Sequence, residues 1–506
     1  MLALALPLAA CSAAGEEPGV AATHDLDAST LIADIADYAE PLAKEWQVPS
    51  IAVGIVTRDG LAAQWYYGEN TAGEPVDGET LFEIGSATKA FLGVSEALLV
   101  ERGDLDWKDP VVDHYPEFQL HDPWVTREMR IEDLLAQRTG MAPYAGETLG
   151  FLGYPYQSVI DSLRYFEPVS SFRSEFAYQN IPHLVAGNIV ANYENTDTWG
   201  DAAEQLIFGP LGMDSTSVAE DALTSAGNAT LGHQMRDGAP LGIVSGRFPT
   251  EAQGAGGIVS NIEDMSKWVA MHLSRGNTED GRFISEELLE DTYRPRVPVT
   301  GEFANGMKQG DGEPHIGYAT GWLVHSTPEG RIIEHGGTTN GYNSSVRMDP
   351  DRGIGIVVLT NLLHQGGLAG PIGKYAMDLI QQREPADYAG QVEAILKERE
   401  AATSDAPDPA PVADKDLEPF KGRYTHPFAG DIEVQAEGGA LVTEIGPRNT
   451  RVVFDPISVS GGEGEFGLTW YYGNDPESWL FTERAVFSGE GAEQRLRIAE
   501  LEFVAT

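Results

Sequence analysis

A stretch rich in proline, alanine and aspartate divides this chain into two parts with different sequence patterns. Residues 401–416 read AATSDAPDPAPVADKD, a composition typical of a semi-rigid linker. Long helical patterns and a few strand patterns precede it, whereas short alternating segments follow it. Because 506 residues are also too many for one ordinary domain, we expect one large folded unit and one small one.

The larger part begins with a helical pattern and a hairpin. Residues 27–46 carry apolar side chains at helical spacing. Two apolar strand candidates, Ser50–Val56 and Leu61–Gly68, flank residues 58–60, whose Asp-Gly pair favours a tight hairpin turn. From about residue 103 to 310 the pattern is mostly helical.

Strand patterns return at residues 331–335, 344–350 and 353–361, and a helical pattern follows at 370–382. Strands, a long helical insertion, more strands and a closing helix predict an α+β fold, with one antiparallel sheet and helices segregated beside it. Short alternating segments after residue 416 predict a small all-β barrel or sandwich. The expected units are a signal and flexible segment (1–25), an α+β domain (26–385), a connecting helix and linker (386–415) and a small β domain (416–506).

The N-terminus resembles a bacterial lipoprotein signal. A short apolar run, MLALALPLAA, ends in Leu8-Ala9-Ala10-Cys11, and such a cysteine would be lipidated. The run lacks the usual basic residues, and an ordinary export signal with a chance cysteine is the alternative. Cys11 is the sole cysteine, so no intrachain disulfide can form. We expect a periplasmic, membrane-anchored lipoprotein, with secretion as the alternative.

Charge argues against nucleic acid as a partner. The chain has 33 Lys and Arg against 78 Asp and Glu, a net charge of −45. Binding phosphates needs basic surface, and acidic excess mainly promotes solubility. No apolar stretch after the N-terminal run reaches the length of a membrane-spanning helix.

Ser86-Ala87-Thr88-Lys89 is a candidate nucleophile with its base. A serine hydroxyl is a weak nucleophile unless a base lies within hydrogen-bonding reach. At a helix start, positions i and i+3 share a face, which places the Lys89 amine over the Ser86 hydroxyl. The following helix is apolar, so burial should push Lys89 toward its neutral, basic form.

A second proton carrier is expected from a Tyr-x-Asn motif, which occurs at Tyr178, Tyr193 and Tyr472. Tyr193 lies in a helical pattern and Tyr472 in the β domain, so both are interpreted as structural. Tyr178 precedes Ile181-Pro182 at a break where a side chain can point into a cleft. Beside a lysine cation, we expect its hydroxyl to shift toward phenolate.

The third candidate element is His335-Gly336-Gly337-Thr338, at the end of a predicted strand. Glycines there let a substrate lie against the strand edge, and the Thr338 amide can complete an oxyanion hole with the Ser86 amide. No His, Asp or Glu pairs occur at metal-ligand spacing, so neither a metal nor another cofactor is expected.

In this order, S-x-x-K, Y-x-N and H-x-G resemble the penicillin-recognising serine hydrolases, nearest to the class C β-lactamase-like group. The resemblance covers roughly residues 30–385. Further stretches similar to the group's pattern are Ile131–Met141, Pro210–Met213, Gly256–Ser260 and Tyr318–Trp322. The resemblance implies that Ser86 is the nucleophile and that Lys89 and Tyr178 move protons. It also implies that Asn180 bonds the substrate amide or Lys89.

The resemblance departs from its pattern at one position that bears on the substrate. Most β-lactamases and carboxypeptidases of the group place a lysine where His335 stands, and some place an arginine or a histidine; a fixed cation there attracts a substrate carboxylate. Because histidine is largely neutral at pH 7, esters, neutral amides or N-terminally cationic D-peptides become better candidates. Arg138 or Arg347 could restore the missing charge.

We therefore predict a serine hydrolase that cleaves a small-molecule ester, an amide or a short peptide through an acyl-enzyme on Ser86. The predicted type is an esterase or a D-amino-acid amidase or peptidase. Two alternatives are a β-lactamase or D-alanyl-D-alanine carboxypeptidase, and a non-catalytic lipoprotein that binds peptidoglycan or peptide. The sequence does not determine the oligomeric state.

Overall fold

The computed structural model describes residues 27–219, 221–236, 239–243, 253–310, 315–363, 367–404, 412–471, 479–498 and 501–506. The predicted signal segment with Cys11 lies outside these residues, as does Tyr472. Within the described part of the chain, none of the helices has the length and apolar character needed to cross a membrane.

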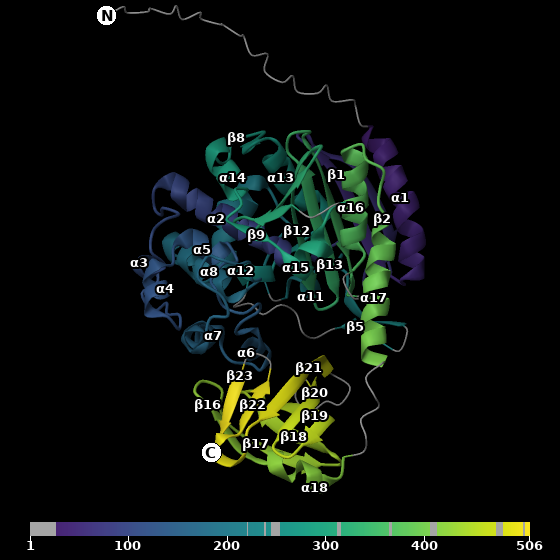
Figure 1. Cartoon of the computed structure of the whole chain (residues 1–506). Helices are drawn as coiled ribbons and strands as arrows, with labels where there is room; N and C mark the ends of the chain where they lie inside the picture. The colour runs from purple at the N-terminus through teal and green to yellow at the C-terminus, as the bar shows by residue number, and fades with distance from the viewer. Residues whose placement is uncertain are drawn as a thin grey trace, which may run out of the picture.

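An eight-stranded sheet forms the centre of the larger domain (Figure 1). Each strand pairs antiparallel with its neighbours, as the sequence predicted. In spatial order the strands are β2 (Gly60–Gly68), β1 (Ser50–Thr57), β14 (Ile354–Thr360), β13 (Tyr342–Asp349), β12 (Gly330–Thr339), β11 (Leu323–Thr327), β10 (Ile316–Tyr318) and β9 (Val297–Val299).

Helices cover both faces of this sheet. Helices α1 (Ala28–Glu45) and α16 (Ala369–Ile380) pack on one face, where Ile35, Ile356 and Ile372 share an apolar core. Helix α13 (Ile262–Leu273) and the helical lobe lie on the other face. Strands β1 and β14 are apolar along their length because both of their faces are covered.

The helical lobe is built around α2 (Thr88–Arg102) and α8 (Ile181–Glu194), which contact each other. Its other helices are α3 (Val111–His114), α4 (Pro123–Glu128), α5 (Ile131–Leu135), α6 (Glu147–Phe151), α7 (Tyr156–Ser162), α9 (Trp199–Ala203), α10 (Gly209–Leu211), α11 (Ala222–Ser225) and α12 (Gln253–Gly256). Helices α14 (Glu286–Thr292) and α15 (Gly301–Met307) lie near strands β9 to β11.

Several short strands outside the central sheet were not predicted. Strands β4 (Gly232–Arg236) and β5 (Ala239–Ile243) form a hairpin, and β4 pairs parallel with β15 (Leu362–Leu363). Two further two-stranded pairs are β3 (Phe82–Glu83) with β6 (Val259–Ser260), and β7 (Asn277–Thr278) with β8 (Gly281–Arg282). The two-residue strands are too short to give an alternation pattern, so a sequence pattern cannot predict them.

The C-terminal domain is a closed barrel (Figure 1), which resolves the predicted choice between barrel and sandwich. Helix α17 (Tyr388–Ser404) leads to it, followed after residues 405–411 by α18 (Asp414–Leu417). Edge-to-face aromatic pairs such as Phe420–Phe466 fill its interior. The strands are β16 (Gly422–His426), β17 (Gly430–Glu437), β18 (Ala440–Ile445), β19 (Thr450–Ser460), β20 (Glu463–Tyr471), β21 (Trp479–Ser488), β22 (Arg495–Ile498) and β23 (Leu501–Ala505).

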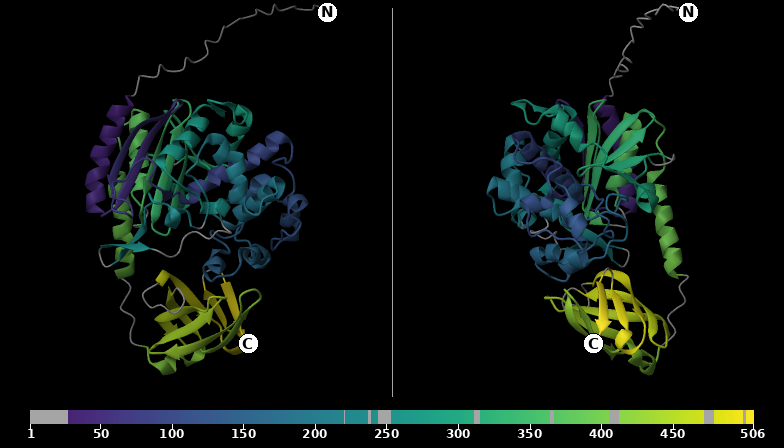
Figure 2. Two further views of the ribbon diagram at one scale, coloured as in Figure 1. Left: turned by 180° about the vertical axis from the view of Figure 1, so that it is seen from behind. Right: turned by 60° about the vertical axis from the view of Figure 1, so that its left-hand side comes forward.

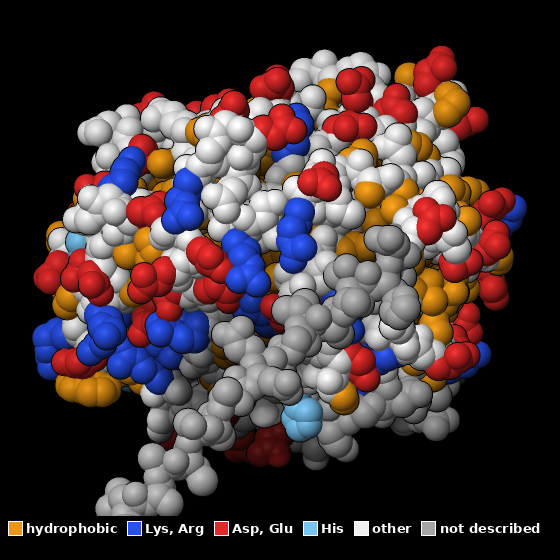
Figure 3. All heavy atoms as spheres, turned by 90° about the horizontal axis from the view of Figure 1, so that it is seen from above, with side chains coloured by type: hydrophobic (Ala, Val, Ile, Leu, Met, Phe, Trp, Pro, Cys, Tyr) orange, Lys and Arg blue, Asp and Glu red, His pale blue; other side chains and the backbone are white. Residues whose placement is uncertain are grey.

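The barrel lies against the end of the helical lobe (Figure 2). The Tyr154 hydroxyl donates to the Ala429 carbonyl at 2.9 Å, and the rings of Tyr154 and Tyr165 lie near Phe428. These contacts involve the segment that follows α6. Viewed from above, Asp and Glu side chains are spread over the molecular surface, in keeping with the net charge (Figure 3).

Candidate active site

Ser86 lies at the junction of a short 3₁₀ turn, Gly85–Ala87, with α2. Gly85 has φ +54°, a conformation that favours glycine. One turn along, the Lys89 amine lies 3.1 Å from the Ser86 hydroxyl and donates to the Ala255 carbonyl at 2.7 Å. The predicted pair therefore meets, and the carbonyl of α12 holds the lysine in place.

Burial makes Lys89 a suitable base. Its side chain is fully buried, and burial lowers its pKa from 10.5 to about 7, while the charge of Glu147 acts in the opposite direction. A substantial fraction of the amine is therefore neutral near pH 7 and can accept the serine proton.

Tyr178 completes the proton network, with its hydroxyl hydrogen-bonded to Ser86 and its ring centroid 4.9 Å from the Lys89 amine. The neighbouring Gln179 fixes this segment. Its backbone N–H donates to the Gln137 side-chain oxygen at 2.6 Å, and its side-chain oxygen accepts from the Thr139 hydroxyl at 2.7 Å. The predicted shift toward phenolate is wrong. Burial raises the pKa of Tyr178 well above 10, with Tyr318 adding to the effect, so its hydroxyl keeps its proton.

His335 lies on β12 and is 3% exposed. Its Nδ1 lies 2.6 Å from the Gly336 carbonyl, so this nitrogen donates, and Nε2 accepts from the Tyr318 hydroxyl at 3.1 Å. Burial, with the nearby Lys89 charge acting in the same direction, lowers the pKa of His335 to about 4. The ring is neutral at pH 7, as the sequence analysis expected.

The two predicted oxyanion donors come from segments that lie side by side. A Cβ on Gly85 would lie 2.7 Å from the Thr338 amide nitrogen, which puts that nitrogen next to the residue preceding Ser86. A Cβ on Gly337 would lie 1.8 Å from the Ile84 carbonyl oxygen, so only glycine permits this approach. The backbone amides of Ser86 and Thr338 can therefore converge on one oxyanion.

The Asn180 side chain bonds Glu147, not Lys89, which was one of the two partners that the resemblance implied. Its amide donates to the Glu147 carboxylate at 2.9 Å, while its carbonyl oxygen is buried without a protein partner. That oxygen can accept a hydrogen bond from a substrate N–H group, the other predicted role. Glu147, on α6, was missed because a single glutamate in a turn-rich stretch carries no pattern.

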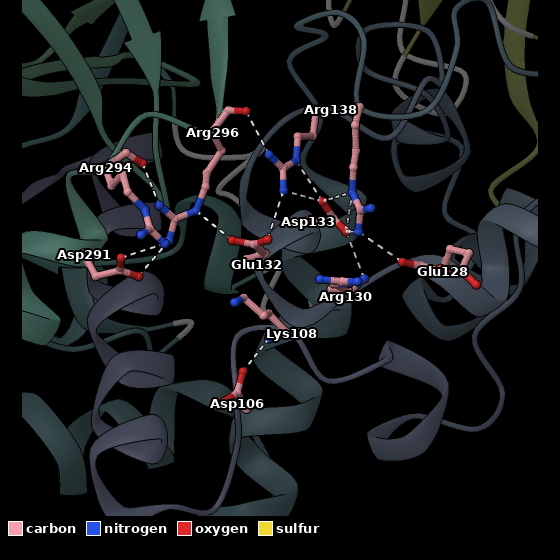
Figure 4. Close-up of polar contacts among 11 residues, drawn as sticks. Asp106, Lys108, Glu128, Arg130, Glu132, Asp133, Arg138, Asp291, Arg294 and Arg296 are labelled. Carbon is pink, nitrogen blue, oxygen red and sulfur yellow. Dashed lines mark hydrogen bonds and ion pairs between the residues drawn. The ribbon is translucent and has the colours of Figure 1, made fainter. Parts of the chain in front are cut away.

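Neither of the two arginines supplies a free positive charge to the site. Arg138 bonds Asp133 at 2.8 Å and Glu132 at 3.3 Å in a network that also includes Arg296 (Figure 4). Arg347 bonds Glu334 at 3.0 Å. Both guanidinium groups are thus neutralised by buried or half-buried carboxylates.

The remaining sequence candidates lie elsewhere. The Tyr193 hydroxyl lies 2.8 Å from His114 Nδ1 on the helical lobe, which supports its structural interpretation. Over the residues that the structure describes, no three His, Cys, Asp or Glu side chains gather as they would around a metal ion.

An antiparallel sheet with a helical lobe, and a serine–lysine–tyrosine cluster between them, define a serine hydrolase of the penicillin-recognising class. A sequence profile of the Beta-lactamase family matches residues 35–376, most of the chain. The chain belongs to this family, as its three motifs suggested.

Curated relatives include two fungal proteins. Unguisins hydrolase ungD′ of Aspergillus campestris is 27% identical over 425 residues, covering 78% of this chain and 76% of the relative. Unguisins hydrolase ungD of Aspergillus violaceofuscus is 24% identical, covering 81% and 77%. Among solved structures, the octameric penicillin-binding protein homologue from Pyrococcus abyssi aligns over 94% of this chain and 99% of its own, with a TM-score of 0.60 and 20% identity. This likeness supports the fold.

Proposed function

We propose that this protein hydrolyses an ester or amide that lacks a free carboxylate, through an acyl-enzyme on Ser86, as an esterase or a D-amino-acid amidase or peptidase. The observation that carries the proposal is the neutral His335 at the third-motif position. Because Arg138 and Arg347 are both paired to carboxylates, neither of these two arginines provides a free cation that would attract a substrate carboxylate.

The reaction proceeds in two steps. Neutral Lys89 takes the Ser86 proton as the serine oxygen attacks the carbonyl carbon, and the Ser86 and Thr338 amides stabilise the oxyanion. The Tyr178 hydroxyl donates a proton to the leaving group and regains one from the lysine ammonium. Water then attacks the acyl-enzyme with the same groups acting in reverse, releasing the acid and free Ser86.

The names of the two fungal relatives, both unguisins hydrolases, support hydrolase activity. The Asn180 carbonyl oxygen, buried without a protein partner, favours a substrate with an N–H group near the scissile bond. The N–H group of an amide or a peptide could donate a hydrogen bond to this oxygen, whereas a simple ester has no N–H group and could not.

The test compares wild type with Ser86→Ala on a short-chain p-nitrophenyl ester, D-alanine p-nitroanilide and a chromogenic cephalosporin. We expect ester or D-amide turnover that disappears in the variant, which should unfold at the same temperature as wild type. Dominant cephalosporin turnover would keep the mechanism but overturn the substrate preference. If wild type is inactive on all three and a fluorophosphonate probe does not label it, the non-catalytic binding lipoprotein becomes the better explanation.

We further propose that the protein is anchored to a membrane through lipidated Cys11. In a Gram-negative host, the full chain should fractionate with membranes and Cys11→Ala with the soluble fraction. Equal distribution of the two proteins would contradict the anchor.

A further inference from the structure

The oxyanion hole proposed for this site joins two segments that are far apart in the chain. The Ser86 amide follows the turn at Ile84 and Gly85, whereas the Thr338 amide belongs to β12. Hydrogen-bond donors stabilise an oxyanion only when they lie about 2.7–3.1 Å from it. The position of one segment against the other therefore controls the rate of the reaction.

Ser344 on β13 holds the segment that carries the nucleophile. Its hydroxyl donates to the Ile84 carbonyl at 2.6 Å, and its side chain is 2% exposed. Ser344 pairs with Gly337 in the sheet, and a Cβ on Gly337 would lie 2.6 Å from the Ser344 oxygen. The glycine of the third motif thus leaves room for this hydrogen bond.

Asn343, the preceding residue, holds the third-motif strand from the opposite face of the sheet. Its amide donates to the Gly337 carbonyl at 3.0 Å and to the Thr338 hydroxyl at 3.2 Å. Its side-chain oxygen accepts from the Ala369 amide at 3.1 Å, at the start of α16. The asparagine therefore connects β12 to a rigid helix behind the sheet.

We propose that Asn343 and Ser344 are positioning residues that hold the two halves of the oxyanion hole in register. Ser344 fixes the half that ends in the Ser86 amide, and Asn343 fixes the half that ends in the Thr338 amide. Both act through backbone atoms of the site. The inference rests on the acyl transfer at Ser86 proposed above.

The experiment measures acylation of the full-length protein by a fluorophosphonate probe, separating the maximal rate of inactivation from the apparent affinity. Ser344→Ala removes the bond to Ile84. Asn343→Asp keeps the side-chain shape but loses both donors. Ser345→Ala is the matched control, because Ser345 is equally buried on the same strand but bonds Arg347 away from the site.

We expect Ser344→Ala and Asn343→Asp to lower the maximal rate by about 10- to 100-fold with affinity unchanged, less than the roughly 100- to 1,000-fold cost of losing a donor outright. Ser345→Ala should keep the wild-type rate. Wild-type rates in both site variants, or equal losses in all three, would overturn the inference. If Ser344→Ala fails to fold, Asn343→Asp alone decides the outcome. An unlabelled wild type would instead refute the proposed function, so the two failures are distinguishable.

Discussion

Glu334 and His335 are neighbours on β12, yet they belong to two buried polar clusters on opposite faces of the sheet. The site cluster consists of Ser86, Lys89, Tyr178, Tyr318 and His335. The far-face cluster consists of His325, Glu334, Arg347 and Lys374. Both clusters are buried, but Glu334 keeps its negative charge, whereas His335 and Tyr178 are neutral at pH 7.

In the far-face cluster, a carboxylate keeps its charge because it has partners. Burial alone would raise the pKa of Glu334, but the charge of Arg347, helped by His325, lowers it to about 2. His325 Nε2 lies 2.9 Å from one carboxylate oxygen of Glu334, and Arg347 lies 3.0 Å from the other, so both carboxylate oxygens are bonded. Lys374 of α16 belongs to the same cluster: burial and the charge of Arg347 lower its pKa to about 7, and its amine donates to the Gly306 carbonyl at 2.8 Å.

In the site cluster, burial favours the neutral form of each titratable group, and in Lys89 it outweighs the opposing charge of Glu147. The Lys89 amine has hydroxyl and carbonyl partners, and its pKa falls to about 7. The pKa of His335 falls to about 4 and that of Tyr178 rises. The comparison shows that a buried group keeps its charge where opposite charges contact it, whereas burial without such contacts favours the neutral form.

The largest expected effect separates the two buried lysines. Lys89→Met should lower kcat at least about 1,000-fold because the serine loses its base. Lys374→Met, the matched control, should keep kcat within about threefold but lower the free energy of unfolding by about 1–3 kcal/mol, since the Gly306 carbonyl loses its 2.8 Å donor. Ester turnover and chemical denaturation measure the two effects. Equal losses of kcat in both variants would contradict the proposal that Lys89, and not Lys374, acts as the base.

Glu334→Gln should lower the free energy of unfolding by about 3–5 kcal/mol, because it leaves the buried Arg347 without its charge partner. In wild type, the folded pKa of about 2 lies below the unfolded value of 4.5, so this stabilisation is present above pH 4.5 and is lost as pH falls toward 2. The variant should therefore lose less stability than wild type between pH 4.5 and 2. An unchanged acid dependence would show that the pair contributes nothing.

The rate should depend on pH through Lys89. With a pKa of about 7, kcat/KM for the ester should rise about tenfold from pH 6 to 8 and then level off. His335→Gln should keep this profile, because the histidine pKa of about 4 lies below the window. A flat profile from pH 6 to 9 would exclude lysine as the base.

The same shift affects stability. Folded Lys89 loses its proton near pH 7, whereas the unfolded chain keeps it to about 10.5. The unfolded state thus binds more protons between these values, and the free energy of unfolding should rise with pH across this window. Lys89→Met should reduce that slope.

The smallest expected effect concerns the substrate. His335→Lys would introduce a cation into the neutral cluster and should raise the ratio of cephalosporin to ester kcat/KM by about tenfold, the effect of roughly 1.4 kcal/mol. His335→Gln is the neutral control and should leave the ratio unchanged. If the lysine variant also leaves it unchanged, the carboxylate argument is wrong.

The sequence predicted the site residues that a local pattern can mark. Ser86 and Lys89 were paired by helix geometry, and His335 and Thr338 by a glycine-rich strand end. Two contacts with distant segments were not predicted. Lys89 meets the Ala255 carbonyl and Asn180 meets Glu147, and neither contact leaves a signal in sequence spacing.

The sequence by itself determined the α+β layout, the separate β domain and the order of the three motifs. These features follow from side-chain periodicity, glycine placement and linker composition, which act over a few residues. Tertiary structure decided three features. They are the closure of the barrel, the ion pairs that Arg138 and Arg347 each form with a carboxylate, and the protonation state of Tyr178. Barrel closure depends on pairing between the first and last strands, β16 and β23, which no local pattern marks. The pKa of Tyr178 depends on burial and on the groups around it, which come from other parts of the chain.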